Sequence, residues 1–356
     1  MKRTRVGIVY GGRSGEHEVS IASAASIFKH LDRTRYEPVS IRIEKDGRWI
    51  LGAPAPTAIS AADVLQQNRS VALEAVEPTS AIDRRVVDVV FPVLHGPYGE
   101  DGTVQGLLEL VNVPYVGAGV LGSAVGMDKV VMKKLFAARD LPICDYEVVL
   151  TRDWRRDERA VLTRVTSRLG FPLFVKPANL GSSVGISKAK HAIELRAAID
   201  LAAEFDRKIV VEAAVPAARE IECAVLGNDE PEASVPGEII PSREFYDYEA
   251  KYLDEGSRSV IPAQLNQEQA ADVRRLSIEA FKAIDGAGMA RVDFLLASDS
   301  GVLYLNELNT IPGFTTISMY AKLWEASGLT YSALLDRLID LAIERHRDKQ
   351  QLRTSM

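Results

Sequence analysis

Two apolar segments near the C-terminal end of the chain carry residues suited to binding a metal ion. Asp293 lies in the first segment, and Glu307 and Asn309 stand two residues apart in the second. If both segments are strands, side-chain alternation places all three on one face of a sheet. Carboxylate and amide oxygens suit Mg²⁺, which also takes oxygens from phosphate and water. The alternative is a pair of polar strand faces without a ligand, but carboxylates on strands this apolar would be costly without a cation.

A second segment combines a lysine at the end of an apolar strand with a loop of small residues. Phe171 to Pro177 is predicted as a strand that contains Lys176, and Gly181 to Gly185 follows it as Gly-Ser-Ser-Val-Gly. Such a loop lets backbone N–H groups approach phosphate oxygens while the ammonium group offsets their charge. The segment lacks the spacing of a Walker loop or of a dinucleotide-binding loop, so an ordinary tight turn would explain it equally well.

Composition sets the class of protein to which these segments belong. The 356 residues exceed the usual domain size of about 100 to 200, so two or three lobes are expected. The formal net charge of −6, with no long basic run, argues against nucleic acid as a partner. Cys144 and Cys223 lack a Cys-x-x-Cys spacing and are interpreted as reduced thiols. With no signal peptide and no apolar run of about 20 residues, the sequence predicts a cytoplasmic protein that does not enter a membrane.

The elements that position the chemical residues fall into three predicted units. In residues 1–124, strands at 6–10, 39–43 and 86–94 alternate with helices at 19–31 and 103–110, which predicts an α/β domain with a parallel sheet. Residues 125–214 are predicted to form a small α+β central lobe. Residues 215–356 form the C-terminal lobe, with a polar, tyrosine-containing segment near 243–259 that is long enough to serve as a lid.

Several short motifs give the chain a resemblance to the ATP-grasp superfamily, and within it to the D-alanine–D-alanine ligases. They occur in the family's order, at Gly12–Ser20, His95–Gly102, Met127–Lys129, Lys176–Pro177 with Gly181–Gly185, Glu244–Tyr252, and Asn306–Thr310 with Pro312–Gly313. Each string alone is weak evidence, but together they cover nearly the whole chain. The resemblance implies an ATP-grasp fold preceded by an N-terminal parallel-sheet domain that binds substrate.

The resemblance implies that ATP binds between the central and C-terminal lobes. The residues that would contact it are Lys129, Lys176, Ser183, Glu212, Ala213, Val215, Glu220 and Lys251. Lys129 and Lys176 would hold the α and β phosphates, and the lid would bring Lys251 to the γ phosphate. Glu212 would belong to the adenine hinge, whose following segment, 214–219, is one residue longer than the usual pattern. Two Mg²⁺ ions, which Mn²⁺ can replace, would be held by the residues first singled out, Asp293, Glu307 and Asn309.

The resemblance also implies places for two D-alanines. Glu16 would bind the ammonium group of the first, and Ser318 with the backbone at Met319 would hold the carboxylate of the second. His95 would lie near the second substrate, although a histidine at a strand end serves equally often as a packing residue. The residues that would assist the chemistry are Ser182 and Tyr252, which connect Glu16 to the lid, and Arg291 and the N–H of Gly313, which stabilise an oxyanion.

The implied activity is the ATP-dependent ligation of two D-alanines through a D-alanyl phosphate, for peptidoglycan precursor synthesis, by a cytoplasmic homodimer. Relatives that make D-alanyl-D-lactate lack the Lys-Tyr pair of the lid, so Lys251 and Tyr252 favour an amine nucleophile. One alternative is another ATP-grasp ligase with a different acceptor. A second is a regulatory ATP-binding module without turnover, which the intact Arg291 and metal-site residues disfavour.

Overall fold

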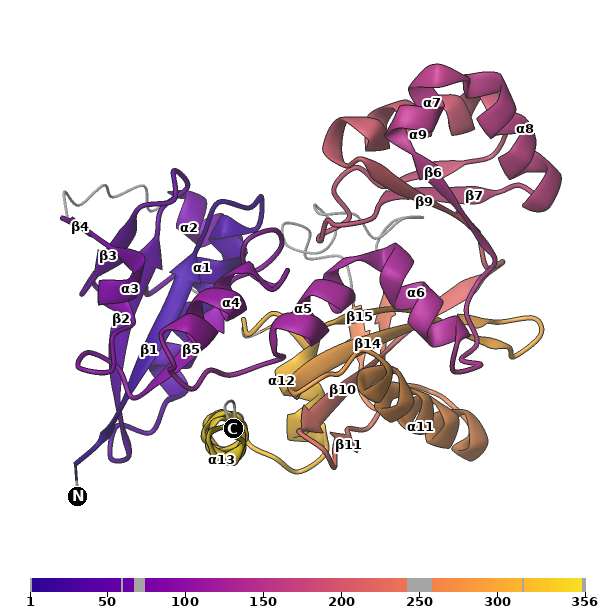
Figure 1. The fold of residues 1–356 in the computed structure, drawn as a ribbon. Coiled ribbons are helices and arrows are strands. Elements are labelled where there is room, and N and C mark those ends of the chain that lie inside the picture. The colour runs from indigo at the N-terminus through magenta and orange to yellow at the C-terminus, as the bar shows by residue number, and fades with distance from the viewer. Residues whose placement is uncertain (1, 59, 67–73, 242–257, 316, 354–356) are drawn as a thin grey trace.

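The structure, a computed structural model, contains three β-sheets connected in chain order (Figure 1). It describes residues 2–353 except 59, 67–73, 242–257 and 316. Lys251, Tyr252 and most of the predicted lid therefore lie outside the described residues.

The N-terminal sheet has the strand order β4-β3-β2-β1-β5. Its strands are β1 (Thr4–Gly11), β2 (Tyr36–Ile43), β3 (Trp49–Leu51), β4 (Ala75–Val76) and β5 (Val89–Val93). The predicted parallel sheet is confirmed for β1, which pairs in parallel with both β2 and β5, whereas β3 and β4 add antiparallel strands that were not predicted. The central strand β1 is apolar on both faces because helices cover it, as is usual for parallel sheets.

Four helices accompany this sheet. They are α1 (His17–His30), α2 (Ala61–Gln66), α3 (Pro78–Ala81) and α4 (Thr103–Leu110). Residues 13–16 join α1 to the glycine turn that ends β1, where Gly11 and Gly12 both have positive φ. Gly11 admits no side chain, because a Cβ there would lie 2.2 Å from the carbonyl oxygen of Ile43. The first turn of α1 is thereby held at the carboxyl end of the sheet, where Glu16 lies.

A four-stranded antiparallel sheet follows, in the order β6-β9-β7-β8. Its strands are β6 (Tyr146–Leu150), β7 (Leu173–Pro177), β8 (Ser187–Ala189) and β9 (Lys208–Ala213). Helices α7 (Thr151–Arg156), α8 (Glu158–Arg168) and α9 (Ala192–Phe205) pack on the sheet (Figure 1) and enclose a small core of their own. Lys176 is the penultimate residue of β7, which ends shortly before the loop of small residues.

The C-terminal sheet runs β13-β12-β10-β14-β15, with β11 paired to β10. Its strands are β10 (Ala218–Gly227), β11 (Glu232–Ala233), β12 (Gly237–Ile240), β13 (Arg258–Val260), β14 (Gly288–Ala297) and β15 (Leu303–Asn309). Helix α11 (Gln267–Ala283) packs on one face of this sheet, together with α5 (Val120–Met127) and α6 (Lys129–Ala137). Residues of α5 and α6 such as Met132 and Phe136 thus share the core of the C-terminal sheet rather than that of the four-stranded sheet.

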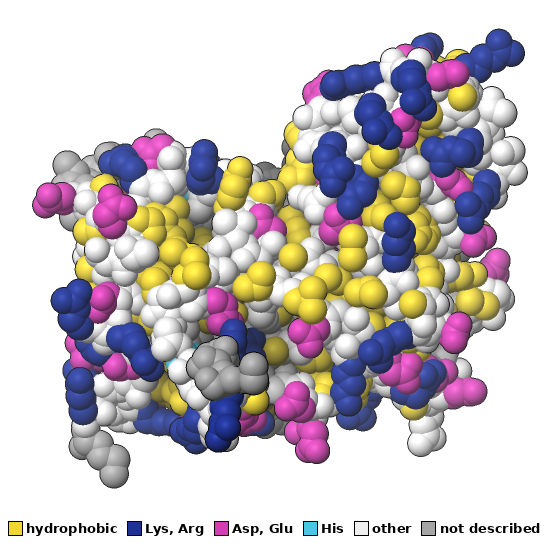
Figure 2. Space-filling model, in the orientation of Figure 1, with side chains coloured by type: hydrophobic (Ala, Val, Ile, Leu, Met, Phe, Trp, Pro, Cys, Tyr) yellow, Lys and Arg dark blue, Asp and Glu magenta, His cyan; other side chains and the backbone are white. Residues whose placement is uncertain are grey.

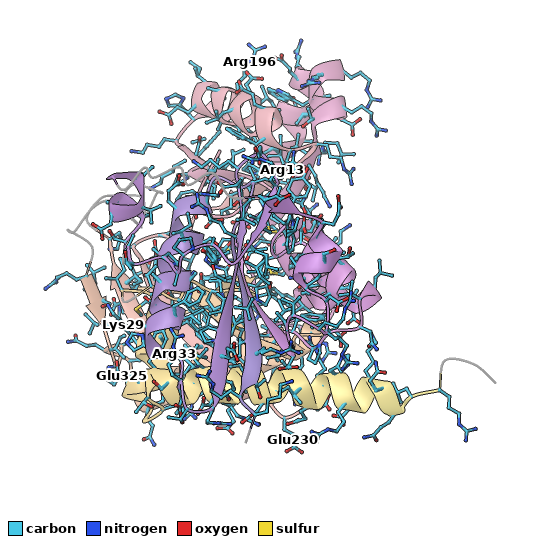
Figure 3. The ribbon with its side chains drawn as sticks, turned by 90° about the vertical axis from the view of Figure 1, so that its left-hand side faces the viewer. Arg13, Lys29, Arg33, Arg196, Glu230 and Glu325 are labelled. Carbon is cyan, nitrogen blue, oxygen red and sulfur yellow. The ribbon has the colours of Figure 1, made fainter. Side chains whose placement is uncertain are left out.

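The last two helices connect the C-terminal sheet to the N-terminal one. They are α12 (Met319–Ala326) and α13 (Tyr331–Gln351), and their apolar residues share one core with α1, β1 and β5. Helix α13 runs along one edge of the molecule below the N-terminal sheet (Figure 3). From it the half-buried Arg345 donates hydrogen bonds to the carbonyl oxygens of Tyr115 and Gly117. The two sheets are therefore packed through a common apolar core, which sets the relative position of their loops.

The surface is charged and mixed in sign. Figure 2 shows basic and acidic side chains interspersed over the visible face, with many of the basic ones on the lobe that carries α7, α8 and α9. Among the described helices, none combines the length and apolar character needed to cross a membrane.

Candidate active site

A cavity of about 560 Å³ lies where loops of the three sheets meet. Its lining includes predicted site residues from the N-terminal domain, the small-residue loop, helix α6 and the C-terminal sheet. They are Glu16, His95, Lys129, Ser182, Arg291, Glu307, Asn309, Gly313, Ser318 and Met319. The structure thus brings together ten residues that are spread over more than 300 positions of the sequence.

Strand pairing places the predicted metal ligands on one face of the C-terminal sheet. In the β14–β15 ladder, Asp293 is opposite Glu307 and Arg291 is opposite Asn309. Directly opposed residues of antiparallel strands point to the same face, so these four side chains form one polar surface. A β-bulge after Asp293 shifts the register of the strands beyond it. The polar surface is thereby confined to the end of the sheet that faces the cavity.

Arg291 lies between two carboxylates on this surface. Its guanidinium donates hydrogen bonds to both oxygens of Asp293, at 2.7 and 2.6 Å, and its Nε lies 3.3 Å from Glu222 Oε2. Glu222 is opposite Asp293 on β10 and is 7% exposed. Glu222 was not among the residues predicted from sequence, and the available signal was the alternation of Glu220, Ile221 and Glu222 at the start of an apolar strand.

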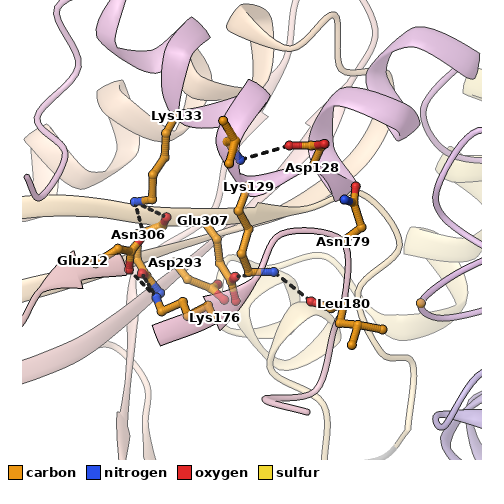
Figure 4. Close-up of polar contacts among 12 residues, drawn as sticks. Asp128, Lys129, Lys133, Lys176, Asn179, Leu180, Glu212, Asp293, Asn306 and Glu307 are labelled. Atoms are coloured by element: carbon orange, nitrogen blue, oxygen red, sulfur yellow. Dashed lines mark hydrogen bonds and ion pairs between the residues drawn. The ribbon is translucent and has the colours of Figure 1, made fainter. Parts of the chain in front are cut away.

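Lys176 and Glu212 belong to a buried charge cluster with Lys133 (Figure 4). Glu212 Oε2 lies 2.5 Å from Lys176 Nζ, and its Oε1 lies 2.8 Å from Lys133 Nζ. Burial would raise the pKa of Glu212, but the two ammonium groups outweigh it and lower this pKa to about 2. Glu212 is therefore ionised at neutral pH and compensates both lysines. Lys133, which the sequence analysis did not assign, is 1% exposed and also donates to the carbonyl oxygen of Asn306.

Lys129 connects helix α6 to the small-residue loop and to the C-terminal sheet. Its Nζ donates to the carbonyl oxygen of Leu180 at 2.8 Å and lies 3.4 Å from Glu307 Oε2. The helix starts at this lysine because the side chain of Asp128 accepts hydrogen bonds from the N–H groups of Val130 and Val131, both at 3.1 Å. Lys129 and Lys176 therefore carry their charges on opposite sides of the same group of carboxylates, as Figure 4 shows.

The small-residue loop closes against Glu16 of the N-terminal domain. The hydroxyl of Ser182 donates to Glu16 Oε1, and a Cβ at Gly181 would lie 2.7 Å from Glu16 Oε2. Ser182 and the following Ser183 have φ values of +50° and +60°, which non-glycine residues seldom adopt. The loop thus holds a strained backbone whose serine hydroxyl reaches a carboxylate more than 160 residues away in sequence.

His95 lies at the carboxyl end of β5 and is 5% exposed. Its Nδ1 is 3.0 Å from the carbonyl oxygen of Ile311, which can only accept, so Nδ1 carries the proton and Nε2 is an acceptor. Burial lowers the pKa of this histidine. Among the described residues Nε2 has no hydrogen-bond partner. The imidazole is therefore held neutral, with a free acceptor at the wall of the cavity.

Gly313, Ser318 and Met319 form the end of the cavity next to α12. The Oγ of Ser318 accepts a hydrogen bond from the N–H of Thr315 at 3.0 Å, and a Cβ at Gly313 would lie 2.8 Å from that oxygen. Only glycine therefore fits beside Ser318 without displacing it. Ser318 is the N-cap residue of α12, and a helix N-terminus favours a negatively charged ligand group.

The remaining predicted ATP contacts lie outside the lining of this cavity. Ala213 ends β9, Val215 lies in the segment that joins β9 to β10, and Glu220 lies on β10 opposite Leu295 of β14. Ser183 and Asp293 are adjacent to lining residues without being part of the lining. Within the described parts of the chain, no three acidic, histidine or cysteine side chains come together as a complete metal site.

Glu100, like Glu222, lines the cavity but was not among the site residues predicted from sequence, although it lies in the His95–Gly102 motif. Its carboxylate is 6% exposed and accepts a hydrogen bond from the N–H of Gly96 at 3.1 Å. Its sequence signal was the motif itself, in which Glu100 precedes Asp101 and Gly102.

Comparison with known proteins places this geometry in a family. The model of the D-ala D-ala ligase N-terminus matches residues 5–118, and that of the D-ala D-ala ligase C-terminus matches residues 135–340. The chain is 52% identical to a D-alanine–D-alanine ligase of Heliobacterium modesticaldum, over 99% of this chain and 97% of the relative.

Two solved structures share the fold. The D-alanine–D-alanine ligase of Coxiella burnetii superimposes with a TM-score of 0.85 at 39% identity, covering 99% of this chain and 97% of that one. The VanG D-Ala:D-Ser ligase of Enterococcus faecalis superimposes with a TM-score of 0.82 at 34% identity, covering 96% of this chain and all of that one.

Proposed function

The chain belongs to the D-alanine–D-alanine ligase family, and from this premise we propose how its own residues carry out the reaction. The enzyme uses ATP to join two D-alanines into D-alanyl-D-alanine, a step in the synthesis of peptidoglycan precursors. A carboxylate must attack an anionic phosphoryl group, and an amine must then attack the acyl phosphate. The site therefore has to offset negative charge and align the reactants before either step. The observation that carries the proposal is the gathering of cationic, carboxylate and small-residue groups around one cavity.

ATP phosphates would lie against the two buried lysines. Lys129 and Lys176 approach the carboxylate surface from separate elements, and Ser183 belongs to the loop whose backbone N–H groups can approach phosphate oxygens. Lys251 of the lid would add a third cation at the γ phosphate. We place the adenine beside Glu212, Ala213 and Val215 and the ribose beside Glu220. Glu212 pairs with both Lys133 and Lys176, which supports a role for this carboxylate in holding Lys176 at the phosphates.

The family uses a divalent metal ion, and we propose two Mg²⁺ ions, with Mn²⁺ as a replacement, at Asp293, Glu307 and Asn309. The fit rests on the donor set, because carboxylate and amide oxygens on one sheet face leave room for phosphate oxygens and water. The metal would offset phosphate charge and orient the transferring phosphoryl group. Asp293 is engaged by Arg291 in the structure, so the guanidinium has to give up at least one of its two hydrogen bonds when Asp293 acts as a ligand.

The first D-alanine would bind with its ammonium group at Glu16, whose orientation is fixed by the hydroxyl of Ser182. Ser318 and the N–H of Met319 would hold the carboxylate of the second D-alanine at the N-terminus of α12, near His95. Arg291 and the N–H of Gly313 would stabilise the oxyanion that forms when the amine attacks. Tyr252, together with Ser182, would connect Glu16 to the lid and assist deprotonation of the incoming amine.

The three sheets support a division into an N-terminal domain at 1–124, a central lobe at 125–214 and a C-terminal lobe at 215–356, with a lid near 243–259. The packing of α5 and α6 on the C-terminal sheet makes the first part of the central unit a connection rather than part of its core. We further propose that the enzyme works as a homodimer in the cytoplasm. Sedimentation of the purified chain tests the dimer.

Phosphate release by the purified protein tests the function. With ATP, Mg²⁺ and D-alanine, we expect phosphate release together with an alanyl-alanine dimer identified by mass, and neither with L-alanine. D-serine and D-lactate are offered in parallel because VanG, which shares the fold, is a D-Ala:D-Ser ligase. If a mixed product forms in preference to the alanine dimer, the second substrate is D-serine or D-lactate and not D-alanine. If a folded, ATP-binding protein releases no phosphate, the chain is a regulatory module.

A further inference from the structure

Glu100 holds a buried carboxyl group that is only half satisfied. Its Oε1 accepts the hydrogen bond from Gly96, while its Oε2 is sealed from solvent and has no hydrogen-bond partner among the described residues. Leaving a buried carboxylate oxygen unpaired is costly, and native structures seldom retain one without a reason. A structural role alone would be served by an amide or an apolar side chain at this position. The unpaired oxygen therefore suggests a group that arrives with a ligand.

The position of Glu100 relative to Glu16 indicates what that group is. Both residues line the cavity, and a Cβ placed on Gly181 would lie 2.7 Å from Glu16 Oε2 and 3.8 Å from Glu100 Oε1. The two carboxylates thus face the same small space. Ser182 donates to Glu16 Oε1 and Gly96 donates to Glu100 Oε1, so within the described parts of the chain no hydrogen bond reaches the second oxygen of either carboxylate. Two carboxylates around one space form a site for a compact cation with several N–H donors.

The charges around Glu100 do not already supply that cation. The ammonium group of Lys129 acts on Glu100 electrostatically, but this lysine is held by Leu180 and Glu307. His95, which comes from the same loop, is neutral. Glu16 and Glu307 add negative charge. Burial, followed by the repulsion from Glu16, raises the pKa of Glu100 to about 8.

We propose that Glu100 is a second carboxylate of the amino-acid site, and that the ammonium group of the first D-alanine binds between it and Glu16. Binding of this ammonium group is expected to ionise Glu100. The inference rests on the proposed function, since it deepens the site assigned to the first substrate. No bond other than the O–H of Glu100 is broken, and the proton passes to the buffer. Ammonium recognition by two carboxylates also gives the site a means of rejecting hydroxy acids at the first position.

Calorimetry tests the proposal on the full chain with Mg²⁺ and a non-hydrolysable ATP analogue. D-alanine is titrated at pH 7 in two buffers of different ionisation enthalpy, which counts the protons released on binding. We expect the wild type to release about one proton per first D-alanine, because a group of pKa near 8 is protonated at this pH. D-lactate, which has no ammonium group, should release none.

Glu100→Gln should release no proton and bind the first D-alanine about 10- to 100-fold more weakly, because a charge-assisted hydrogen bond is lost. Its KM for ATP should not change. Glu18→Gln is the matched control: Glu18 is another nearly buried carboxylate of the N-terminal domain, paired with Lys45 at 2.6 Å on its outer side, and the variant should keep both affinity and proton release.

Binding of D-alanine to the wild type without proton release, with equal affinity in Glu100→Gln, would overturn the inference and leave the proposed function intact. Failure of the wild type to bind D-alanine would instead refute the proposed function. Should Glu100→Gln not fold, Glu100→Asp retains the ionisable group on a shorter side chain. Glu100→Asp should still release a proton on binding D-alanine, but with a lower affinity. If this variant releases no proton and binds D-alanine as tightly as the wild type, the proposal is wrong.

Discussion

Arg291 and Asp293 stand two residues apart on β14 and form a two-pronged ion pair, with the Arg291 Nε and Nη2 at 2.7 and 2.6 Å from the two Asp293 oxygens. The residue proposed to stabilise an oxyanion therefore holds the residue proposed to bind metal. A planar guanidinium matches a carboxylate in this way, and residues two apart on a strand lie on the same face. Metal binding at Asp293 and the release of Arg291 toward the acyl group are consequently expected to be linked.

Asp293→Asn should remove turnover without unfolding the protein. We expect kcat to fall at least about 100-fold, because the charge stabilisation supplied through a metal ion is worth several kcal/mol. Asparagine keeps one acceptor for Arg291, so the free energy of unfolding should change by about 1 kcal/mol. Thermal melting with and without Mg²⁺ and ATP separates the two effects, since ligand binding raises the melting temperature only when the site is intact. An undiminished Mg²⁺-dependent shift in the variant would contradict the metal assignment.

Arg291→Lys keeps the positive charge but loses the forked donor geometry. We expect kcat to fall about 100-fold, as when an oxyanion-hole donor is removed, with KM for ATP unchanged. Single-turnover kinetics with D-alanine should show the loss in peptide bond formation. Arg219→Lys is a matched control, because Arg219 makes the same forked pair with Glu238 on the same sheet but outside the cavity lining. Equal losses in both variants would reduce Arg291 to a structural residue.

Glu212→Gln should change the dependence of stability on pH. The folded pKa of Glu212 is lowered to about 2 from the ordinary value of 4.5, so its contribution is complete above about pH 4.5 and is lost as the pH falls toward 2. At neutral pH the variant leaves Lys133 and Lys176 without their common partner, and we expect a loss of about 3 to 5 kcal/mol. Because the difference from wild type should shrink below pH 4.5, urea unfolding at pH 7, 4.5 and 3 checks it.

Glu147→Gln serves as the control for that measurement. Glu147 is also buried, on β6, but its partners Arg164 and Arg168 are largely exposed on α8, so neither arginine becomes a buried, uncompensated charge. We expect a loss of about 1 kcal/mol or less at neutral pH. If the two variants lose the same free energy of unfolding, the Lys133–Glu212–Lys176 cluster stabilises the fold no more than ion pairs with exposed arginines do.

Tyr252→Phe tests the lid assignment, which comes from the sequence resemblance alone. The variant should weaken discrimination between an amine and a hydroxyl acceptor, so that D-lactate competes better with D-alanine near neutral pH, while ATP binding stays nearly intact. Product ratios measured by mass at several pH values check this expectation. An unchanged ratio with full activity would remove Tyr252 from the acceptor site.

Local spacing made much of the fold predictable. The expected helix at 103–110 coincides with the structure's α4 (Thr103–Leu110), and β14 and β15 lie where their apolar runs predicted them. In each case the signal is a repeat of apolar residues, every two positions in a strand or every three to four in a helix, which depends only on neighbouring residues. The short antiparallel strands β3 and β4 were missed because two or three residues carry no periodicity.

The sequence by itself determined the family, the order of the motifs and the strand face shared by Asp293, Glu307 and Asn309, because these depend on residue types and on alternation along neighbouring strands. Only the tertiary structure decided that Glu222 flanks Arg291, that Glu212 compensates two lysines, and that Glu100 faces the same space as Glu16. These contacts join segments far apart in the chain. Their geometry follows from the placement of the three sheets, two of which share an apolar core while the third has its own, and no local pattern encodes this placement.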